Sequence, residues 1–134
     1  MSLLYYEILT PEKTLEKGEC LSVTLETSQG EVGIMYGHIP LVMGLIPGII
    51  RIVKEDGKTE KLVCGEGFAD VRQEGLFILC QTAERKEDLS YERVKKALDE
   101  HTVKFNDPLT TRSERKISAA TISRAAARMR LLNE

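Results

Sequence analysis

The sequence predicts an N-terminal all-β sandwich or barrel followed by a C-terminal helical hairpin. Turn residues recur roughly every 8–12 positions as far as Gly75, which is the strand spacing of such folds. After residue 83 the spacing of the apolar residues becomes helical. The 134 residues suffice for one small domain with an appendage. We therefore divide the chain into a β-domain, residues 1–84, and a helical hairpin, residues 85–134.

Strands of the β-domain are indicated by alternation of apolar and polar residues. It is clearest in YYEIL, CLSVTLETS and GLFILCQTA, at residues 5–9, 20–28 and 75–83. Asp56-Gly57 lies between two alternating runs, which is a strong signal for a tight hairpin turn. Glu74-Gly75 separates the next two runs in the same way. We expect a β-hairpin at each of these two dipeptides.

The first helix is expected over residues 89–105, which contain no glycine or proline. Either Asp88 or Ser90 can cap its start. Pro108 cannot continue a helix, so the turn is predicted at residues 106–108. The residues at helical spacing are Val94, Ala97, Leu98, His101 and Phe105.

The second helix is predicted to start at Thr111, because Thr111 and Glu114 have the spacing of a capping box. Many of its residues are alanines, whose small side chains bury little apolar area. We therefore expect a hairpin that docks weakly and can open. Its predicted apolar stripe is Ser118, Ile122, Ala125, Ala126, Met129 and Leu132.

The net charge of −2 conceals an asymmetry along the chain. Residues 1–84 contain seven Lys and Arg against thirteen Asp and Glu, a balance of −6. Residues 109–134 contain six against two, a balance of +4, and the segment between them is neutral. An acidic front and a basic tail predict two parts with different partners.

Several classes of protein are disfavoured by composition. No apolar run approaches the ~20 residues of a membrane span, and no secretion signal is recognisable, so the chain reads as cytosolic. Cys20, Cys64 and Cys80 lie far apart in strand-like runs, without a Cys-x-x-Cys motif. Zinc binding and thiol redox chemistry are therefore disfavoured, and we expect three buried free thiols.

The stretch GEVGIMYGHIPL, residues 30–41, is the first candidate for a functional site. It is no phosphate-binding loop, because a Walker A motif requires a lysine before a helix and here His38 follows Gly37. His38 can act as a base or a ligand, yet the only other histidine is His101, in the tail. A small enzyme using His38 stays an alternative without a partner carboxylate or nucleophile.

Arg124 and Arg128 form the second candidate, because residues at i and i+4 share one helix face. Together with Arg93 they can grip a phosphate or a row of carboxylates. The alternative is a solvated basic face. Nucleic acid is a weaker candidate, because aromatic residues do not interleave and the β-domain is acidic. An adaptor function is favoured over an enzyme, with a free-standing nucleotide-binding sensor as the rival.

The order and spacing of several motifs resemble the epsilon subunit of bacterial F-type ATP synthase over the whole chain. The resemblance implies about ten strands in the β-sandwich, an antiparallel two-helix hairpin and a non-catalytic role in the rotor. The matching segments are YYEILTPEKTL at 5–15, GEVGIMYGHIPL at 30–41, LIPG at 45–48, GFADV at 67–71 and Ala83-Glu84.

This resemblance also implies partners. The β-domain would bind the gamma subunit and rest on the c-subunit ring, passing ion-driven rotation to the catalytic alpha/beta head. The chain would lie on the cytoplasmic side of the bacterial cell membrane, peripheral and without direct membrane insertion. The glycines at 30–37 would form turns, with Ile34 and Met35 anchoring the loop. The implied contact residues for gamma and the c ring are Glu31, Gly33, Met35, His38 and Pro40.

For the hairpin, the resemblance implies a switch between a folded form and an extended form that inhibits ATP hydrolysis. Basic residues of the second helix would approach an acidic segment of a catalytic beta subunit. Each exposed pair contributes only ~0.2–1 kcal/mol, so several must act together. The implied inhibitory residues are Arg112, Arg115, Lys116, Arg124 and Arg128.

Some members of the family bind regulatory ATP between the hairpin helices, through Ile/Leu-Asp-x-x-Arg-Ala. Here the motif reads Leu89-Ser90-Tyr91-Glu92-Arg93-Val94, with serine in place of aspartate and valine in place of alanine. A serine does not accept hydrogen bonds as strongly as a carboxylate. The resemblance therefore implies ATP binding that is weakened or absent, with a partial site of Glu84, Arg93, Arg124 and Arg128, and no other cofactor.

Overall fold

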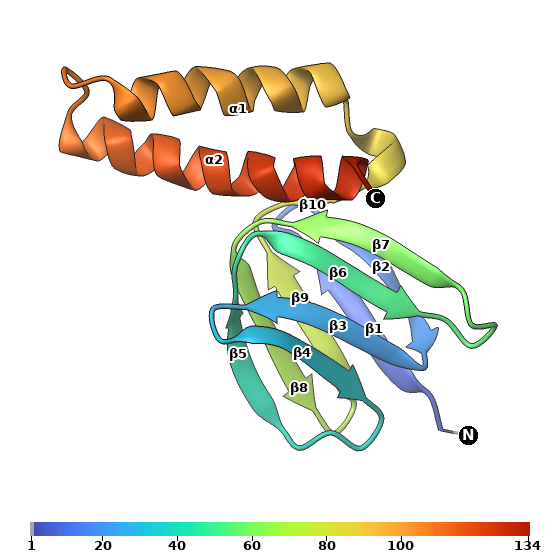
Figure 1. Ribbon diagram of the computed structural model, residues 1–134. Helices are drawn as coiled ribbons and strands as arrows, with labels where there is room; N and C mark the ends of the chain where they lie inside the picture. The colour runs from blue at the N-terminus through green and yellow to red at the C-terminus, as the bar shows by residue number, and fades with distance from the viewer. Residues whose placement is uncertain (1) are drawn as a thin grey trace.

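The computed structural model describes residues 2–134 and consists of a ten-stranded β-sandwich with a helical hairpin on one end (Figure 1). This confirms the predicted fold class. The strands are β1 Leu4–Leu9, β2 Thr14–Cys20, β3 Ser22–Thr27, β4 Gly30–Met35, β5 Leu41–Leu45, β6 Gly48–Val53, β7 Thr59–Cys64, β8 Gly67–Arg72, β9 Gly75–Cys80 and β10 Ala83–Arg85. The helices are the 3₁₀ turn η1 Lys86–Asp88, α1 Tyr91–Asn106 and α2 Arg112–Leu132.

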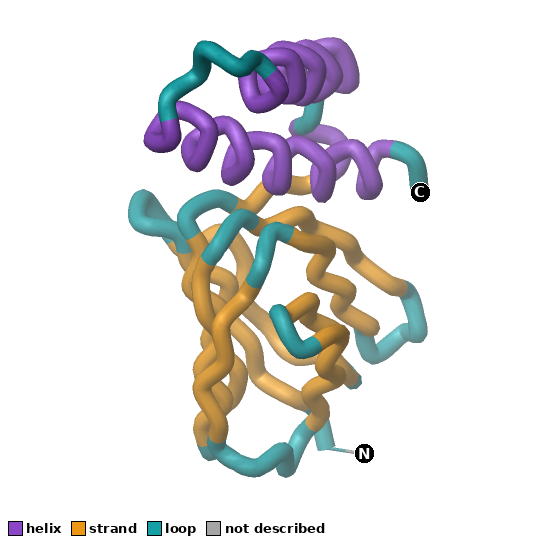
Figure 2. The backbone as a smooth tube through the Cα atoms, turned by 60° about the vertical axis from the view of Figure 1, so that its left-hand side comes forward, coloured by secondary structure: helices purple, strands orange, loops and turns teal. Residues whose placement is uncertain are grey.

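The strands form one continuous sheet that folds over on itself (Figure 2). Their order is β10-β7-β6-β3-β5-β8-β9-β1-β2, with β4 paired to β3. The pairing of β1 with β9 is parallel, and the other pairs are antiparallel. Arg85 on β10 and Glu16 on β2 form an ion pair of 3.2 Å. It links the two end strands of the sheet and so closes the sandwich.

Alternate side chains of the strands fill the core, as the sequence pattern predicts. In β1, Leu4, Tyr6 and Ile8 point inward and their neighbours are partly exposed. The three cysteines are buried and unpaired, as expected. Burial raises the pKa of the Cys64 thiol to about 12, and a neighbouring Cys80 adds to it. The protonated thiols therefore act as small apolar side chains in the core.

Glycine is required at the two predicted hairpin turns. Gly57 lies between β6 and β7 with a φ of +87°, and Gly75 begins β9, directly after the turn from β8, with a φ of +151°. At both φ values a residue with a side chain would be strained, and glycine is not. The antiparallel pairing of β6 with β7 and of β8 with β9 confirms both predicted hairpins. Gly37 is also in a turn, with a φ of +85°. Gly33 instead lies within β4 opposite Thr24, so the prediction of a turn there is wrong.

The helices begin where their caps predict. Ser90, rather than Asp88, caps α1, and its hydroxyl accepts a hydrogen bond from the Arg93 N–H. Thr111 and Glu114 form both hydrogen bonds of the capping box of α2. The start of each helix can be predicted from the local sequence because each capping hydrogen bond joins residues only three positions apart.

The predicted apolar stripe of α2 is only partly correct. Ser118 and Ala125 are buried as predicted, and Ser118 lies 3.2 Å from the His101 ring of α1. Ala127 and Leu131 are buried too, but against the sandwich, and they were not predicted. The reason is that α2 lies between α1 and the β-domain and therefore has two contact faces (Figure 1). A single helical stripe describes only one of them.

Candidate functional site

The contact between hairpin and sandwich has a small apolar centre. Ala127 and Leu131 of α2 pack against Ile49 of β6 and Val63 of β7, and Leu89 lies beside them. This cluster is separate from the core of the sandwich. Because so few apolar side chains are involved, it contributes much less to stability than the core does. The expectation of a weakly docked hairpin is consistent with this contact.

Ion pairs surround this apolar cluster. Three arginines of α2 each bind a different glutamate of the β-domain, and the three glutamates come from separate segments of that domain. Their charges are opposite, as the acidic front and basic tail of the sequence indicate. The pairs are Arg124 with Glu66 at 3.0 Å, Arg128 with Glu84 at 2.8 Å and Arg130 with Glu26 at 3.2 Å.

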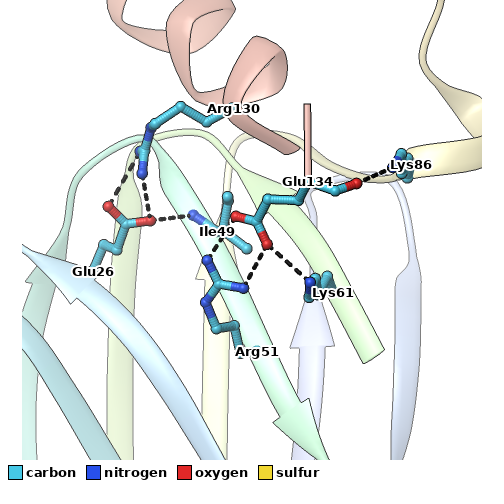
Figure 3. Close-up of polar contacts among 7 residues, drawn as sticks. All are labelled: Glu26, Ile49, Arg51, Lys61, Lys86, Arg130 and Glu134. Carbon is cyan, nitrogen blue, oxygen red and sulfur yellow. Dashed lines mark hydrogen bonds and ion pairs between the residues drawn. The ribbon is translucent and has the colours of Figure 1, made fainter. Parts of the chain in front are cut away.

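Glu134 reverses this polarity, because here the hairpin supplies the carboxylate (Figure 3). Both terminal nitrogens of Arg51 donate to its two carboxylate oxygens at 2.7 Å. Lys61 lies 2.9 Å from the same carboxylate, and Lys86 donates to the main-chain oxygen of Glu134. The hydrogen bond from Arg51, followed by that from Lys61, lowers the pKa of the Glu134 carboxyl to about 2. Glu134 is therefore ionised at any physiological pH.

Sequence reasoning missed the pairs of Arg130 and Glu134. Arg130 and Glu26 are 104 positions apart, and Arg51 and Glu134 are 83 positions apart. The only signal was the general charge asymmetry, which does not select partners. Glu26 is further held by the Ile49 N–H, which donates to its carboxylate at 2.7 Å (Figure 3).

The predicted nucleotide residues are only partly brought together. Glu84 and Arg128 bind each other, whereas Arg124 binds Glu66 instead. The Arg93 side chain is exposed, and within residues 2–134 no hydrogen bond or ion pair joins it to another side chain. The remaining predicted residues have structural contacts: Leu89 lies in the apolar cluster, Ser90 caps α1 and Val94 is buried.

The predicted inhibitory residues also separate in this arrangement. Arg124 and Arg128 face the sandwich through their ion pairs. Arg115 donates to the main-chain oxygens of Phe105 and Asp107, so it holds the turn between the helices. Arg112 and Lys116 are not in an ion pair with any of residues 2–134, and Arg112 is exposed to solvent.

The predicted partner residues extend along β4 and the turn after it. That turn lies at the end of the sandwich away from the hairpin (Figure 1), whereas Glu31 is paired with Glu26, which binds Arg130 of α2. Ile34 is buried and anchors this segment, but Met35 is 59% exposed, so its predicted anchoring role is wrong. His38 is held by its ring Nδ1, which lies 2.8 Å from the Ile39 carbonyl oxygen. Because a carbonyl only accepts, Nδ1 carries the proton there. Glu31, Gly33 and Pro40 are exposed.

A cavity of about 380 Å³ adjoins this surface. Its lining includes Met35, His38 and Pro40, together with Tyr5 and Arg72. Three of the five predicted partner residues therefore meet at one hollow, while Glu31 and Gly33 lie outside it. Met35 is thus an exposed apolar side chain beside a hollow, a combination that is common at protein interfaces.

A second exposed apolar surface was not predicted. Leu9, Leu79 and Phe68 are paired neighbours across β1, β9 and β8, and we call them the apolar strip. Phe68 is 46% exposed and Leu79 37%, and the strip lines a cavity of about 500 Å³. The signal was present in GFADV, where alternation places Phe68 on the face opposite the buried Ala69 and Val71.

Two kinds of site are absent from the part of the chain that the structure describes. No group of three or more His, Cys, Asp or Glu side chains in residues 2–134 is arranged to hold a metal ion. Neither helix in this range combines the length and the apolar character that a membrane crossing requires.

A small sandwich with two exposed apolar surfaces, and a hairpin docked through a small apolar cluster and ion pairs, has the features of a subunit of a larger assembly. Residues 3–86 match the family model of the beta-sandwich domain of the ATP synthase delta/epsilon chain. The ATP synthase epsilon chain of Shouchella clausii is 34% identical over 129 residues, covering 96% of this chain and 94% of the relative. The chloroplastic epsilon chain of Guillardia theta is 31% identical over 130 residues, covering 97% and 98%. The chain belongs to the family of ATP synthase epsilon chains.

Solved structures agree with this assignment. A chain in the Euglena gracilis mitochondrial ATP synthase, from an assembly of OSCP, F1 and c-ring, superposes with a TM-score of 0.87 at 25% identity. The match covers 98% of this chain and 82% of that chain. The resemblance stated from the motifs is thereby confirmed, as is the expectation of a non-catalytic subunit of the ATP synthase complex.

Proposed function

We propose that this chain is the central-stalk subunit that couples rotation of the c ring to the catalytic head, and that its hairpin inhibits ATP hydrolysis. The observation that carries the proposal is the hairpin contact, which is an apolar cluster of five side chains within a ring of ion pairs. Such a contact can separate while the core of the sandwich, a different cluster, stays intact.

The coupling part rests on the two exposed surfaces of the β-domain. The turn after β4, with Met35, His38 and Pro40, would face the c ring and the gamma subunit from the end of the sandwich away from the hairpin (Figure 1). Glu31 and Gly33 would extend this contact along β4. The apolar strip would extend the contact with gamma, since a polypeptide partner would cover its exposed area. The chain would then lie on the cytoplasmic side of the membrane, attached through the complex.

The inhibitory part rests on charge. When the hairpin leaves the sandwich, Arg124, Arg128 and Arg130 lose their glutamates. Together with Arg112, Arg115 and Lys116 they give α2 six cations, which suits an acidic segment of a catalytic subunit. The glutamates of the sandwich compete for the same arginines. Docking and inhibition therefore exclude each other.

Regulatory ATP is proposed to bind weakly or not at all. Ser90 already accepts the Arg93 N–H as the cap of α1, and the buried Val94 fills space that an alanine would leave open. Glu84 and Arg128 neutralise each other. Isothermal titration calorimetry with ATP tests this, and micromolar affinity would overturn it.

ATP hydrolysis by a reconstituted ATPase core tests the inhibitory proposal. The full-length chain should suppress hydrolysis relative to a chain lacking residues 89–134, and ATP preincubation should change neither rate. Equal rates with the two chains would refute inhibition while leaving the coupling role open. Coupling is tested by co-purification with gamma, which Phe68→Asp should weaken and Val103→Asp, at an exposed position of α1, should not.

A further inference from the structure

Three cations from separate elements converge on one residue of the hairpin, Glu134 (Figure 3). Arg51 lies on β6, Lys61 on β7 and Lys86 in η1, and we call them the cation triad. Arg51 grips the Glu134 carboxylate with two nitrogens at 2.7 Å, and Lys61 approaches it to 2.9 Å. Lys86 binds the main-chain oxygen of the same residue. The triad is thus occupied by an anionic group of the chain itself.

The register of the sheet makes this convergence unfavourable without an anion. Arg51 and Lys61 are direct partners across β6 and β7. Like charges placed opposite each other destabilise a strand pair. Glu134 bridges them in the docked form and removes the repulsion. When the hairpin leaves, the two cations face each other again.

The charge balance of the vacated site stays positive. Departure of the hairpin removes Arg130 and Glu134 together. Arg51 and Lys61 of the sandwich and Lys86 of η1 remain, beside Glu26 and Glu31, which makes a balance of +1. Residues 1–84 as a whole have a balance of −6. Glu26 still accepts the Ile49 N–H, which holds its carboxylate toward β6. An anion would therefore be drawn to this one place on an otherwise acidic domain.

We propose that the cation triad is a binding site for a polyvalent phosphate anion, for which Glu134 substitutes in the docked form. A guanidinium fork accepts a carboxylate or a phosphate in the same two-pronged way. The Glu134 carboxylate supplies a single negative charge to the two cations that it contacts, whereas a phosphate or pyrophosphate supplies more. The anion and the docked hairpin then exclude each other. This inference rests on the proposed release of the hairpin, and it adds a ligand that favours the released form.

Calorimetry with pyrophosphate on the isolated full-length chain tests the site, with sodium chloride added to hold the ionic strength constant. Glu134→Gln removes the negative charge that Arg51 and Lys61 bind. This variant should bind pyrophosphate roughly 2- to 30-fold more tightly than the unchanged chain, because these two ion pairs no longer compete with it. Adding Arg51→Gln or Lys61→Gln to that variant should reverse the gain. Adding Lys17→Gln, an exposed lysine on β2, should not.

Equal affinity of the unchanged chain and Glu134→Gln would overturn the proposal, as would binding by neither or binding that survives Arg51→Gln. Circular dichroism shows that each variant is folded, and the two triad substitutions check each other. Vesicles that contain phosphatidic acid distinguish a lipid headgroup from a soluble phosphate, because that headgroup is also a phosphate group that can carry two negative charges. None of these measurements involves ATP hydrolysis. A failure of inhibition by the hairpin therefore leaves the anion result standing, and the reverse also holds.

Discussion

Leu131 offers the sharpest test of how the hairpin is held. Its side chain is 1% exposed and packs in the apolar cluster between α2 and the sandwich. Leu131→Ala removes three carbons, worth about 0.8 kcal/mol each, or about 2.4 kcal/mol in total. A rigid core would add a cavity penalty, but a helix docked on a surface can settle into the gap. We expect docking to weaken by ~2–3 kcal/mol, a roughly 30- to 150-fold fall in the ratio of docked to undocked chains.

Hydrogen exchange measures this change, because amides of α2 that the docked form protects should exchange faster by the same factor. The core strands of the sandwich should exchange as before, since Leu131 is not part of their cluster. Leu109→Ala is the matched control: Leu109 is 90% exposed, so the same substitution should change little. Unchanged exchange in α2 would refute the role of the apolar cluster. Equal acceleration in α2 and in the sandwich would refute independent release of the hairpin.

Three further predictions concern charge, capping and packing. The pKa of Glu134 is held at about 2, by Arg51 first, against an ordinary 4.5, so its contribution to docking is complete above pH 4.5 and disappears as the pH falls through 2. Fluorescence energy transfer between hairpin and sandwich measures docking of the unchanged chain and of Glu134→Gln. The difference between the two should vanish as the pH falls from 4.5 to 2, and a difference that stays constant would contradict this role of Glu134. Thr111→Ala removes the cap of α2 and should lower the stability of the hairpin by ~1 kcal/mol, seen as faster exchange in its first turn, and unaltered exchange there would count against it. Gly67→Ala places a carbon 2.0 Å from the main-chain oxygen of a β9 residue. It should lower the free energy of unfolding, measured in urea, by ~1–3 kcal/mol. Gly33→Ala meets no atom within 4 Å and should change this free energy little, and similar losses at both positions would show the packing argument to be wrong.

Local features were predictable because their causes lie within a few residues. The hairpins at Gly57 and Gly75 require a backbone conformation that glycine adopts without strain. The starts of α1 and α2 are set by hydrogen bonds from Ser90 and Thr111 to main-chain groups three positions away. Alternation likewise predicted strands β1 and β3, in which every second side chain is buried.

Contacts between distant segments were not predictable. The stripe of α2 was read as one face, but the helix is packed from two sides, so Ala127 and Leu131 were missed. The apolar strip was overlooked because alternation places Phe68 on the outer face of β8 but does not tell whether another element covers that face. Arg124 and Arg128 were expected to act as one pair, yet they bind different glutamates.

The sequence by itself determined the β-sandwich, the two helices with their caps, the opposite charges of the two parts and, through its motifs, the family. Each follows from short-range periodicity, from backbone preferences or from a matched order of residues. Only the tertiary structure decided which charges meet: Arg130 with Glu26, and Glu134 with Arg51 and Lys61. Ion pairs between segments about a hundred positions apart depend on where helix α2 lies on the sandwich, and packing, not local sequence, sets that position.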